Sequence, residues 1–159
     1  MADGAVSYCQ PVGYEIASFE ASVSLPISRE QFRSSIMEVQ GEMLAQPQIE
    51  CPVTHHFAPG AYGREILLPK GSLVVGKIHK HSHINVISKG RVSVITETGR
   101  KELSAPCTFV SDVGTKRAVY AHEDTVWTTI HVSNETDLEK LEDDIIAKSY
   151  DELSLLEKL

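Results

Sequence analysis

The sequence is poor in cysteine and aromatic residues, has no excess of basic side chains and contains no long apolar run. Its cysteines, Cys9, Cys51 and Cys107, are unevenly spaced and form no CxxC pair, which argues against a disulfide framework and favours a reducing, cytoplasmic compartment. Lysine and arginine number 15 against 22 acidic residues, a formal net charge of −7, which excludes a fold-wide basic surface for nucleic acid. No apolar stretch approaches the roughly 18–20 residues that cross a bilayer, and residues 1–10 lack the pattern of a secretory signal.

Histidine, by contrast, is plentiful. The 159 residues are 42% hydrophobic and 23% charged, which fits one ordinary globular domain and excludes a disordered tail, a fibre or a coiled-coil rod. Within this average composition, seven histidines outnumber three cysteines. Because histidine is the commonest metal ligand and a proton carrier near neutral pH, the placement of these residues is the first question for function.

Residues 1–61 are predicted to form an N-terminal extension with one helix over about 29–45. Ser28 stands three residues before Gln31, which is the spacing of a capping box, and Pro47 ends the helical pattern. Apolar residues then recur at three- and four-residue steps and give the helix one buried face. This face consists of Phe32, Ile36, Val39 and Met43.

The flanking parts of this extension have weaker patterns. Residues 15–23 partly alternate between apolar and polar side chains and predict a peripheral strand. The stretch 46–61 contains three prolines and a glycine and predicts an irregular connection.

Residues 62–133 have a different pattern, in which short β-rich runs alternate with turn residues such as Lys89-Gly90 and Thr98-Gly99. Eight short strands at this spacing predict a small antiparallel β-barrel or jelly roll rather than a parallel sheet with crossover helices. The predicted strands are 62–68, 72–79, 83–88, 91–97, 100–104, 108–111, 116–121 and 125–133.

Residues 134–159 are predicted to be a helical C-terminal segment of the same single domain. Leu138, Leu141 and Ile145 share one face of a helix over 137–148, and a second short helix follows over 151–159. These helices are expected to cover an edge of the barrel or to pair with a second subunit, because exposed edge strands need such cover.

Three of the histidines lie within five residues, in the stretch His79-Lys80-His81-Ser82-His83. Strand side chains alternate between faces, so on one continuous strand His79, His81, His83 and Asn85 would point the same way. If a turn falls at 80–82, His79 ends one strand, His83 begins the next, and His81 sits in the turn. Both geometries gather imidazoles within reach of one divalent transition metal, which could be zinc, iron, manganese or nickel.

The segment from Gly71 to Gly90 resembles the first motif of the cupin superfamily, which has a glycine, five residues, His-x-His, three or four residues, a glutamate, six residues and a glycine. In this spacing His79 takes the second histidine position and His83 the glutamate position, while Lys77 replaces the first histidine. The second cupin motif is echoed around Gly114, with Arg117 at its histidine position.

This resemblance implies a cupin-like barrel over 62–133 with a metal-binding cavity. It also implies a homodimer, because cupins commonly pair through strand edges and helices. Charged lysine and arginine are not ordinary ligands, so the two replacements remove part of the usual ligand set. The stretches His56-Phe57-Ala58-Pro59-Gly60 and Arg64-Glu65, with His131 after Trp127, also resemble small bacteriophage-encoded cupins of unassigned activity. That likeness implies a cytoplasmic protein of an infected host or a component of the virion.

The last predicted strand supplies further candidates. Trp127, Thr129 and His131 share one face of it, so His131 is a candidate third ligand, with His81 as a fourth. Either Arg117 or His122 faces the cavity, depending on register, and the cupin spacing favours Arg117. The predicted substrate-binding residues are accordingly Arg117, Asn85 and Trp127. A guanidinium in the cavity suits a carboxylate or a phosphate.

Two functions follow from these patterns. The first is a metal-centred site that binds or acts on a small anionic molecule, with oxygenase, isomerase and hydrolase chemistry all open. The second is a non-enzymatic module, either a phage structural or assembly component or a small-ligand binding protein. The replacements at Lys77 and Arg117 favour the second, and the fold alone does not choose between them. No nucleic-acid or membrane partner is expected.

Overall fold

The computed structural model describes residues 8–10 and 28–156, which form strands and three helices. The helices are α2 (Arg29–Leu44), α3 (Leu138–Ile145) and α4 (Tyr150–Leu156). The strands are β1 (Tyr8–Gln10), β2 (Val53–Ala58), β3 (Ala61–Leu68), β4 (Leu73–Val75), β5 (Ile78–His79), β6 (His83–Lys89), β7 (Arg91–Thr96), β8 (Gly99–Ser104), β9 (Cys107–Ser111), β10 (Ala118–Ala121), β11 (Thr125–His131) and β12 (Ile146–Ala147).

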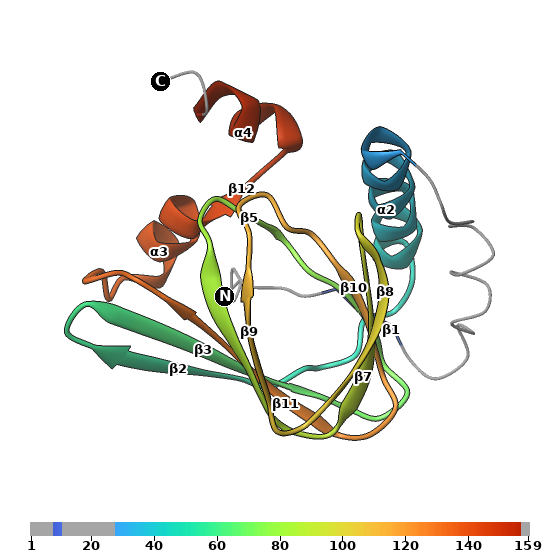
Figure 1. Cartoon of the computed structure of the whole chain (residues 1–159), viewed down its shortest axis with the longest axis horizontal. Coiled ribbons are helices and arrows are strands. Elements are labelled where there is room, and N and C mark those ends of the chain that lie inside the picture. The colour runs from blue at the N-terminus through green and yellow to red at the C-terminus, as the bar shows by residue number, and fades with distance from the viewer. Residues whose placement is uncertain (1–7, 11–27, 157–159) are drawn as a thin grey trace.

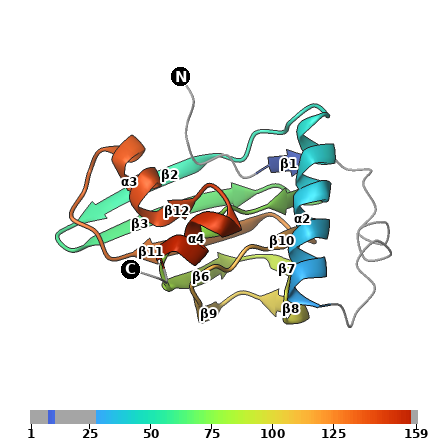
Figure 2. The ribbon, with the colours of Figure 1, turned by 90° about the horizontal axis from the view of Figure 1, so that it is seen from above.

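Two five-stranded antiparallel sheets make up the body of the protein (Figures 1 and 2). The first sheet has the order β1-β4-β10-β7-β8 and the second the order β2-β3-β11-β6-β9, while β12 and β5 form a separate two-stranded sheet. The predicted mainly β architecture, with an N-terminal helix and C-terminal helices, is confirmed.

Most of the predicted strands are found, and the errors have local causes. The predicted irregular connection over 46–61 is wrong for β2, which pairs along its whole length with β3. As an edge strand with four of its six residues exposed, β2 shows little apolar alternation. The predicted strand 72–79 divides into β4 and β5, and the C-terminal end of the predicted helix 137–148 is extended as β12. The peripheral strand expected over 15–23 lies outside the described residues.

Helix α2 covers the outer face of the first sheet (Figure 1). The capping box is present, because the Ser28 hydroxyl accepts from the Gln31 amide while the Gln31 side chain accepts from the Ser28 amide. The predicted apolar face is buried against Leu73, Val75 and Ile95 of the sheet. Burying a large apolar side chain contributes about 1.5–3 kcal/mol, so this face fixes the helix on the sheet.

The core lies between the two sheets. Its side chains come from alternate positions of facing strands, with Ile87 and Trp127 from the second sheet and Val92, Val94 and Val119 from the first. The opposite side chains of β10, Ala118 among them, pack under α2 instead. The register of β10 therefore decides which residues face the interior, and one residue of slippage would reverse it.

The C-terminal segment closes one end of the space between the sheets. In Figures 1 and 2, α3 and β12 lie across that end, with α4 farther along the chain. Strand β12 pairs with β5, and α3 buries Leu141 and Ile145 against Tyr62. None of the described helices is long and apolar enough to cross a membrane.

The cysteines do not all follow the sequence expectation. Cys107 is a free thiol, but Cys51 is disulfide-bonded, so the expectation of reduced cysteines is wrong for this residue. Both pack at the edge of the main core.

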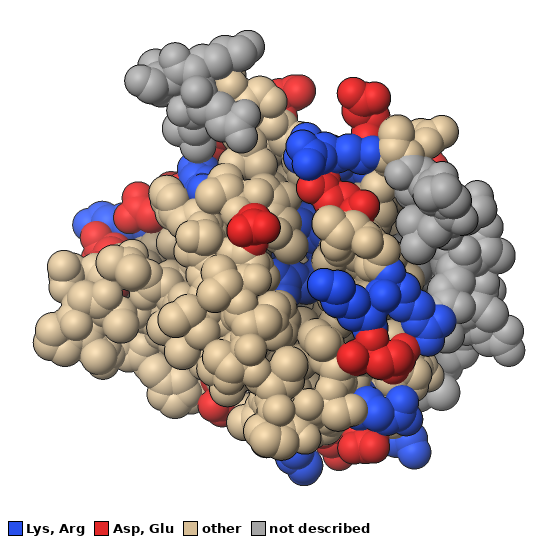
Figure 3. Space-filling model, in the orientation of Figure 1, with Lys and Arg blue, Asp and Glu red and all other residues tan. Residues whose placement is uncertain are grey.

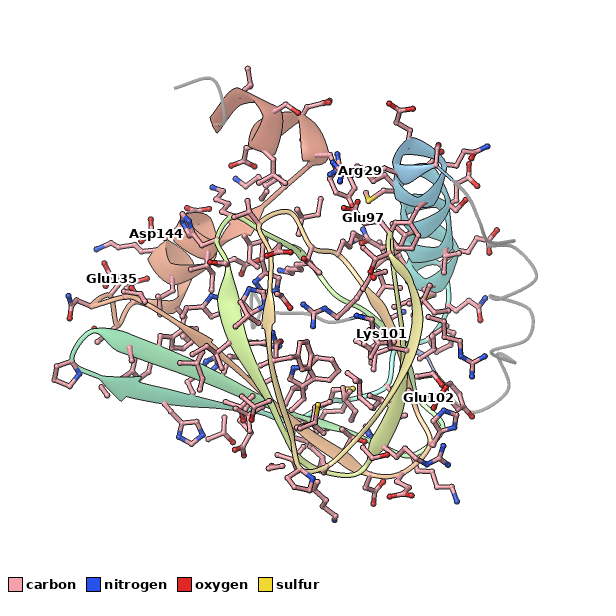
Figure 4. All side chains as sticks on the ribbon, in the orientation of Figure 1. Arg29, Glu97, Lys101, Glu102, Glu135 and Asp144 are labelled. Carbon is pink, nitrogen blue, oxygen red and sulfur yellow. The ribbon has the colours of Figure 1, made fainter. Side chains whose placement is uncertain are left out.

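Charged side chains are unevenly distributed over the surface. In the view of Figure 3 they gather around α2, β8 and the C-terminal helices, whereas the broad surface over β2 and β3 carries few. One charged cluster joins α2 to the β7–β8 turn: Arg29 and Glu97 lie side by side (Figure 4), with their Nε and Oε1 atoms 3.3 Å apart. Such exposed pairs contribute only about 0–1 kcal/mol each.

Replacing Gly90 by alanine should strongly destabilise the fold. Gly90 has a φ of +92°, and a Cβ there would lie 2.6 Å from the carbonyl oxygen of Asp124 and would also clash with Thr125. Strain and overpacking together predict a loss of about 3 kcal/mol in the free energy of unfolding, measured by urea denaturation. Gly41→Ala is the matched control, because a Cβ at this helical position meets nothing within 4 Å and should stabilise α2 by about 0.5–1 kcal/mol. Equal effects of the two substitutions would contradict this account.

Candidate functional site

The inner face of the second sheet presents its side chains in cross-strand rows. One row is apolar and contains Ile66, Trp127 and Ile87, which are partners across β3, β11 and β6. Two residues farther along β11, about 7 Å away, the row becomes polar, with Arg64, Thr129 and Asn85. Another such step reaches His131, whose partner on β3 is Tyr62. The sheet thus grades from an apolar interior to an imidazole near the end covered by α3.

Three histidines meet at this end. His131 comes from the end of β11, His83 from the start of β6 and His79 from the end of β5. Their rings stack, with centroids 4.1 Å apart for His79 and His83 and 4.8 Å apart for His83 and His131. One nitrogen from each ring lies within 4.8 Å of the other two. Ligands of a tetrahedral site bind zinc at about 2.0–2.1 Å, so small side-chain rotations would bring all three onto one ion.

These imidazoles have nitrogen atoms that no hydrogen bond satisfies. Nδ1 of His79, Nε2 of His83 and Nε2 of His131 are buried and have no hydrogen-bond partner within the described part of the chain. The other nitrogen of His83, Nδ1, lies 3.2 Å from the His81 carbonyl oxygen. Because Nδ1 must donate to that oxygen, Nε2 keeps its lone pair and is available as a ligand.

All three rings are held neutral. Burial lowers the pKa of His79 well below its ordinary value, and the neighbouring His83 and His131 lower it further. Burial also lowers the pKa of His83, although the bond to the His81 carbonyl partly opposes this. Burial lowers the pKa of His131 to about 4. Metal binding requires unprotonated imidazole, so the cluster is suited to a metal ion at neutral pH.

The fourth predicted ligand, His81, is not part of this cluster. The chain bends at residues 80 and 81, so His79 and His83 lie on separate strands. His81 is exposed in this bend, and its Nε2 lies 3.1 Å from the Asp144 carbonyl oxygen. The geometry with a turn at 80–82 is therefore the one that the structure adopts.

A cavity of about 120 Å³ lies beside the histidines, between the sheets and under α3. Its apolar lining includes Leu68, Val74 and Val119, and α3 covers it with Leu141 and Ile145. Its cationic lining residues are Arg64, Lys77 and Arg117. Glu142 of α3 is the single acidic residue among the described residues that line it.

Arg117 is the most buried of these cations, with 8% of its surface exposed. Its Nη1 donates to Oδ1 of Asn85 at 3.3 Å and its Nη2 to Oγ of Ser111 at 2.5 Å. Its guanidinium carbon lies 5.3 Å from the centre of the Trp127 ring. Burial lowers the pKa of Arg117 to about 10, so the side chain stays charged at neutral pH.

Asn85 holds this group together. Its Oδ1 also accepts from the Trp127 indole at 3.0 Å, and its Nδ2 donates to Ser111 at 2.9 Å. Asn85 is fully buried, so its amide orients both the guanidinium and the indole. The predicted substrate-binding residues Arg117, Asn85 and Trp127 are thus brought together in one hydrogen-bonded group on the cavity wall. His122 lies elsewhere, with its Nε2 2.6 Å from the Ser93 hydroxyl.

Two side-chain contacts at the site were not anticipated from the sequence. Lys77 and Glu142 form an ion pair where α3 meets the cavity, although the acidic stretch of α3 reads as a solvated face. His55, which the sequence places in an irregular connection, lies on β2, and its Nδ1 is 2.7 Å from the Tyr62 hydroxyl. His55 and Tyr62 also line the cavity. The apolar spacing of Leu141 and Ile145 indicated that α3 buries one face, whereas no local pattern indicated the contact of His55.

Comparison with known proteins places the fold. No protein-family model and no curated sequence matches the chain. Among solved structures, a salicylate 1,2-dioxygenase from Pseudaminobacter salicylatoxidans matches with a TM-score of 0.53 and 10% identity over 77% of this chain and 37% of that one. The ectoine synthase of P. lautus matches with a TM-score of 0.50 and 10% identity over 62% of this chain and 75% of that one. A cupin domain from Bordetella pertussis matches with a TM-score of 0.44 and 15% identity over 55% of this chain and 98% of that one.

These neighbours are similar in fold alone, because their sequences are so different. The dioxygenase and the synthase share the two-sheet β fold of this chain, in agreement with the small antiparallel β architecture predicted from the strand pattern. The chain spans little more than a third of the dioxygenase, at 37% of its length.

The lowered histidine pKa values predict that the metal-free protein loses stability in mild acid. Below the ordinary pKa of 6.5, the unfolded chain takes up protons that the folded protein, with a His131 pKa of about 4, does not. The free energy of unfolding should therefore fall as the pH falls from about 6.5 to about 4, with His131 alone contributing a loss of about 2 kcal/mol between pH 7 and pH 5. Urea denaturation in the presence of a chelator measures this slope. His131→Asn should flatten the slope, and an unchanged slope in this variant would contradict the account.

Proposed function

We propose that this chain is a cupin-type metal-binding protein in which His79, His83 and His131 hold one divalent transition-metal ion beside a cavity for a small anionic molecule. The observation that carries this proposal is a cluster of three histidines, each with a buried nitrogen that has no hydrogen-bond partner among the described residues and a ligand nitrogen within 4.8 Å of the other two. A buried polar atom without a partner lowers the stability of the fold by about 1–3 kcal/mol. Three such atoms in one cluster are therefore unexpected unless the site binds a ligand.

The donor set suits a transition metal. Three neutral imidazoles with a backbone carbonyl behind one of them resemble the three-ligand sites that leave a coordination position open for water or substrate. Such an ion would supply Lewis-acid activation of a bound group or a hydroxide at neutral pH. Imidazole binds zinc, iron, manganese and nickel, so the donor set does not select among them. Two proteins of the same fold are named as enzymes, a dioxygenase and a synthase, which supports a metal-centred role without assigning the reaction.

The anionic character of the proposed ligand rests on the cavity. Arg117 lines it, Asn85 and Trp127 orient Arg117, and Glu142, the one carboxylate among the described lining residues, is already paired with Lys77. A small anion entering this space would meet an uncompensated positive charge in a largely apolar surrounding, where electrostatic attraction is strong.

A binding module without catalysis is the second candidate. Glu142 is the acidic residue among the described residues lining the cavity, and its ion pair with Lys77 keeps it from acting as a base. Chemistry at this site would then depend on the ion and on the histidine–tyrosine pair of His55 and Tyr62. If the protein is a phage component, it should co-purify with virions or assembly intermediates.

Metal analysis of protein purified without a histidine tag tests the first candidate. We expect close to one equivalent of a transition metal per chain, measured by mass spectrometry after reconstitution and desalting. The double variant His79→Ala/His83→Ala should lose it, because a single imidazole cannot hold the ion. His56→Ala is the matched control, since its side chain is 56% exposed and lies outside the cluster. Metal-free wild-type protein that stays folded after reconstitution would overturn the proposal.

The C-terminal segment formed by α3, β12 and α4 should contribute to metal affinity, because it holds β5, the strand that carries His79. Strand β5 pairs with β12, and Lys80 donates from its Nζ to Glu152 and to the Asp143 carbonyl oxygen, at 2.7 Å each. Lys80→Ala should loosen β5 and weaken metal binding several-fold, measured by competition with a chromophoric chelator. Lys148→Ala removes a longer pair of 3.8 Å between side chains that are 85% and 73% exposed, and it should have no such effect. Equal metal affinities in the two variants would show that the C-terminal segment does not support the metal site.

A further inference from the structure

Arg117 is a buried cation without a carboxylate partner. Its polar contacts are the neutral side chains of Asn85 and Ser111, and no acidic residue within the described part of the chain forms a salt bridge with it. Burying a charge without an opposite charge is costly, so proteins pair such groups, or a ligand does. Lys77, the neighbouring cation, already has Glu142. The charge that remains uncompensated in the cavity is therefore close to Arg117.

The neutral contacts fix the direction of the guanidinium. Asn85 takes one donor of Arg117 and Ser111 another, and Trp127 lies against the guanidinium plane. A guanidinium has five N–H donors, so these two contacts leave donors available to a planar partner. Because Asn85 is itself hydrogen-bonded to Trp127 and Ser111, the guanidinium of Arg117 is held in place before any ligand binds.

The rest of the cavity favours a compact apolar body over a second charged group. Ile66, Leu68, Val74, Val119 and Trp127 line the part that lies deeper between the sheets. A phosphate would need several more donors, yet the first amides of α3 are already capped by Asp137, which accepts from Glu139 and Lys140. The cavity is also small, at about 120 Å³, so the ligand that fits is short.

We propose that the anion is a small monocarboxylate with a compact apolar body, which binds with its carboxylate on the Arg117 guanidinium and its body against Val74, Val119 and Trp127. This inference deepens the proposed function, because it names the chemical class of the anion. Asn85 and Ser111 act as positioning residues, since they orient the guanidinium and do not contact the ligand themselves. Bidentate contacts between a guanidinium and a carboxylate are strong in an apolar surrounding.

Binding of isovalerate to metal-free protein tests the proposal, with isovaleramide as a probe of the same shape and no charge. Titration calorimetry and thermal shift should detect isovalerate and show at least tenfold weaker binding of the amide. Phosphate and sulfate should bind at least tenfold more weakly than isovalerate. The metal is removed by a chelator, so that a carboxylate cannot bind through the ion and Arg117 is tested alone.

Two variants and a control separate binding from folding. Arg117→Met should abolish isovalerate binding and leave the denaturation midpoint of the ligand-free protein unchanged or higher, because it removes an uncompensated buried charge. A purely structural arginine would lower that midpoint. Arg117→Lys keeps the charge without the fork, so it should fold if the methionine variant does not and should bind isovalerate several-fold more weakly. Arg91→Met is the control, because Arg91 is a surface residue paired with Glu102 and Glu123.

The outcomes distinguish this inference from the proposed metal site. Equal binding of acid and amide, or unchanged isovalerate binding in Arg117→Met, overturns the carboxylate site even if the protein holds its metal. Tight phosphate binding without isovalerate binding overturns the ligand class. Isovalerate binding that depends on Arg117 in a protein that takes up no metal supports this inference while the metal proposal fails.

Discussion

The alternation of side chains along β11 is the constraint on which the site depends. Every second residue of this strand faces the interior, so Trp127, Thr129 and His131 must share one side. Pairing with β3 on one side and β6 on the other extends each of these positions into a row. The apolar row belongs to the core, and the imidazole lies near the covered end. A slip of one residue would expose His131 and bury Ile130, and both the core and the candidate metal site would be lost together.

The strands and the histidine pair could be predicted from the sequence because their signals are local. Turn residues bound the strands closely, and His79 and His83 converge in either of the two geometries that the sequence allows. The position of His81 could not be settled, because it depends on whether the chain bends at 80 and 81, and that bend depends in part on Lys80 and the distant C-terminal segment. Strand β2 was missed because its partner β3, rather than its own composition, makes it a strand.

Residues from distant parts of the chain were the hardest to foresee. Glu142 reads as one more charge on an acidic helix, and only the docking of α3 over the cavity gives it a partner in Lys77. His55 pairs with Tyr62 because β2 and β3 form a hairpin, which the prolines in that region conceal. Arg117, in contrast, was anticipated from the spacing of a motif, because that spacing is local in the sequence and does not depend on a contact across the fold.

The site also differs in charge from the molecule that carries it. The chain has a formal charge of −7, so an anion approaching from a distance meets a net repulsion. Within the cavity the balance is reversed, since Arg117 has no carboxylate partner among the described residues and Glu142, the one acidic side chain in the described lining, is bound to Lys77. Screening by salt weakens the outer field within about 10 Å at 0.1 M, whereas buried charges are screened much less. The local field of the buried guanidinium, rather than the net charge, therefore decides which sign of ligand the cavity accepts. The neutral imidazoles beside it keep their nitrogens available to a metal ion, because a proton would compete with the ion for the same nitrogens.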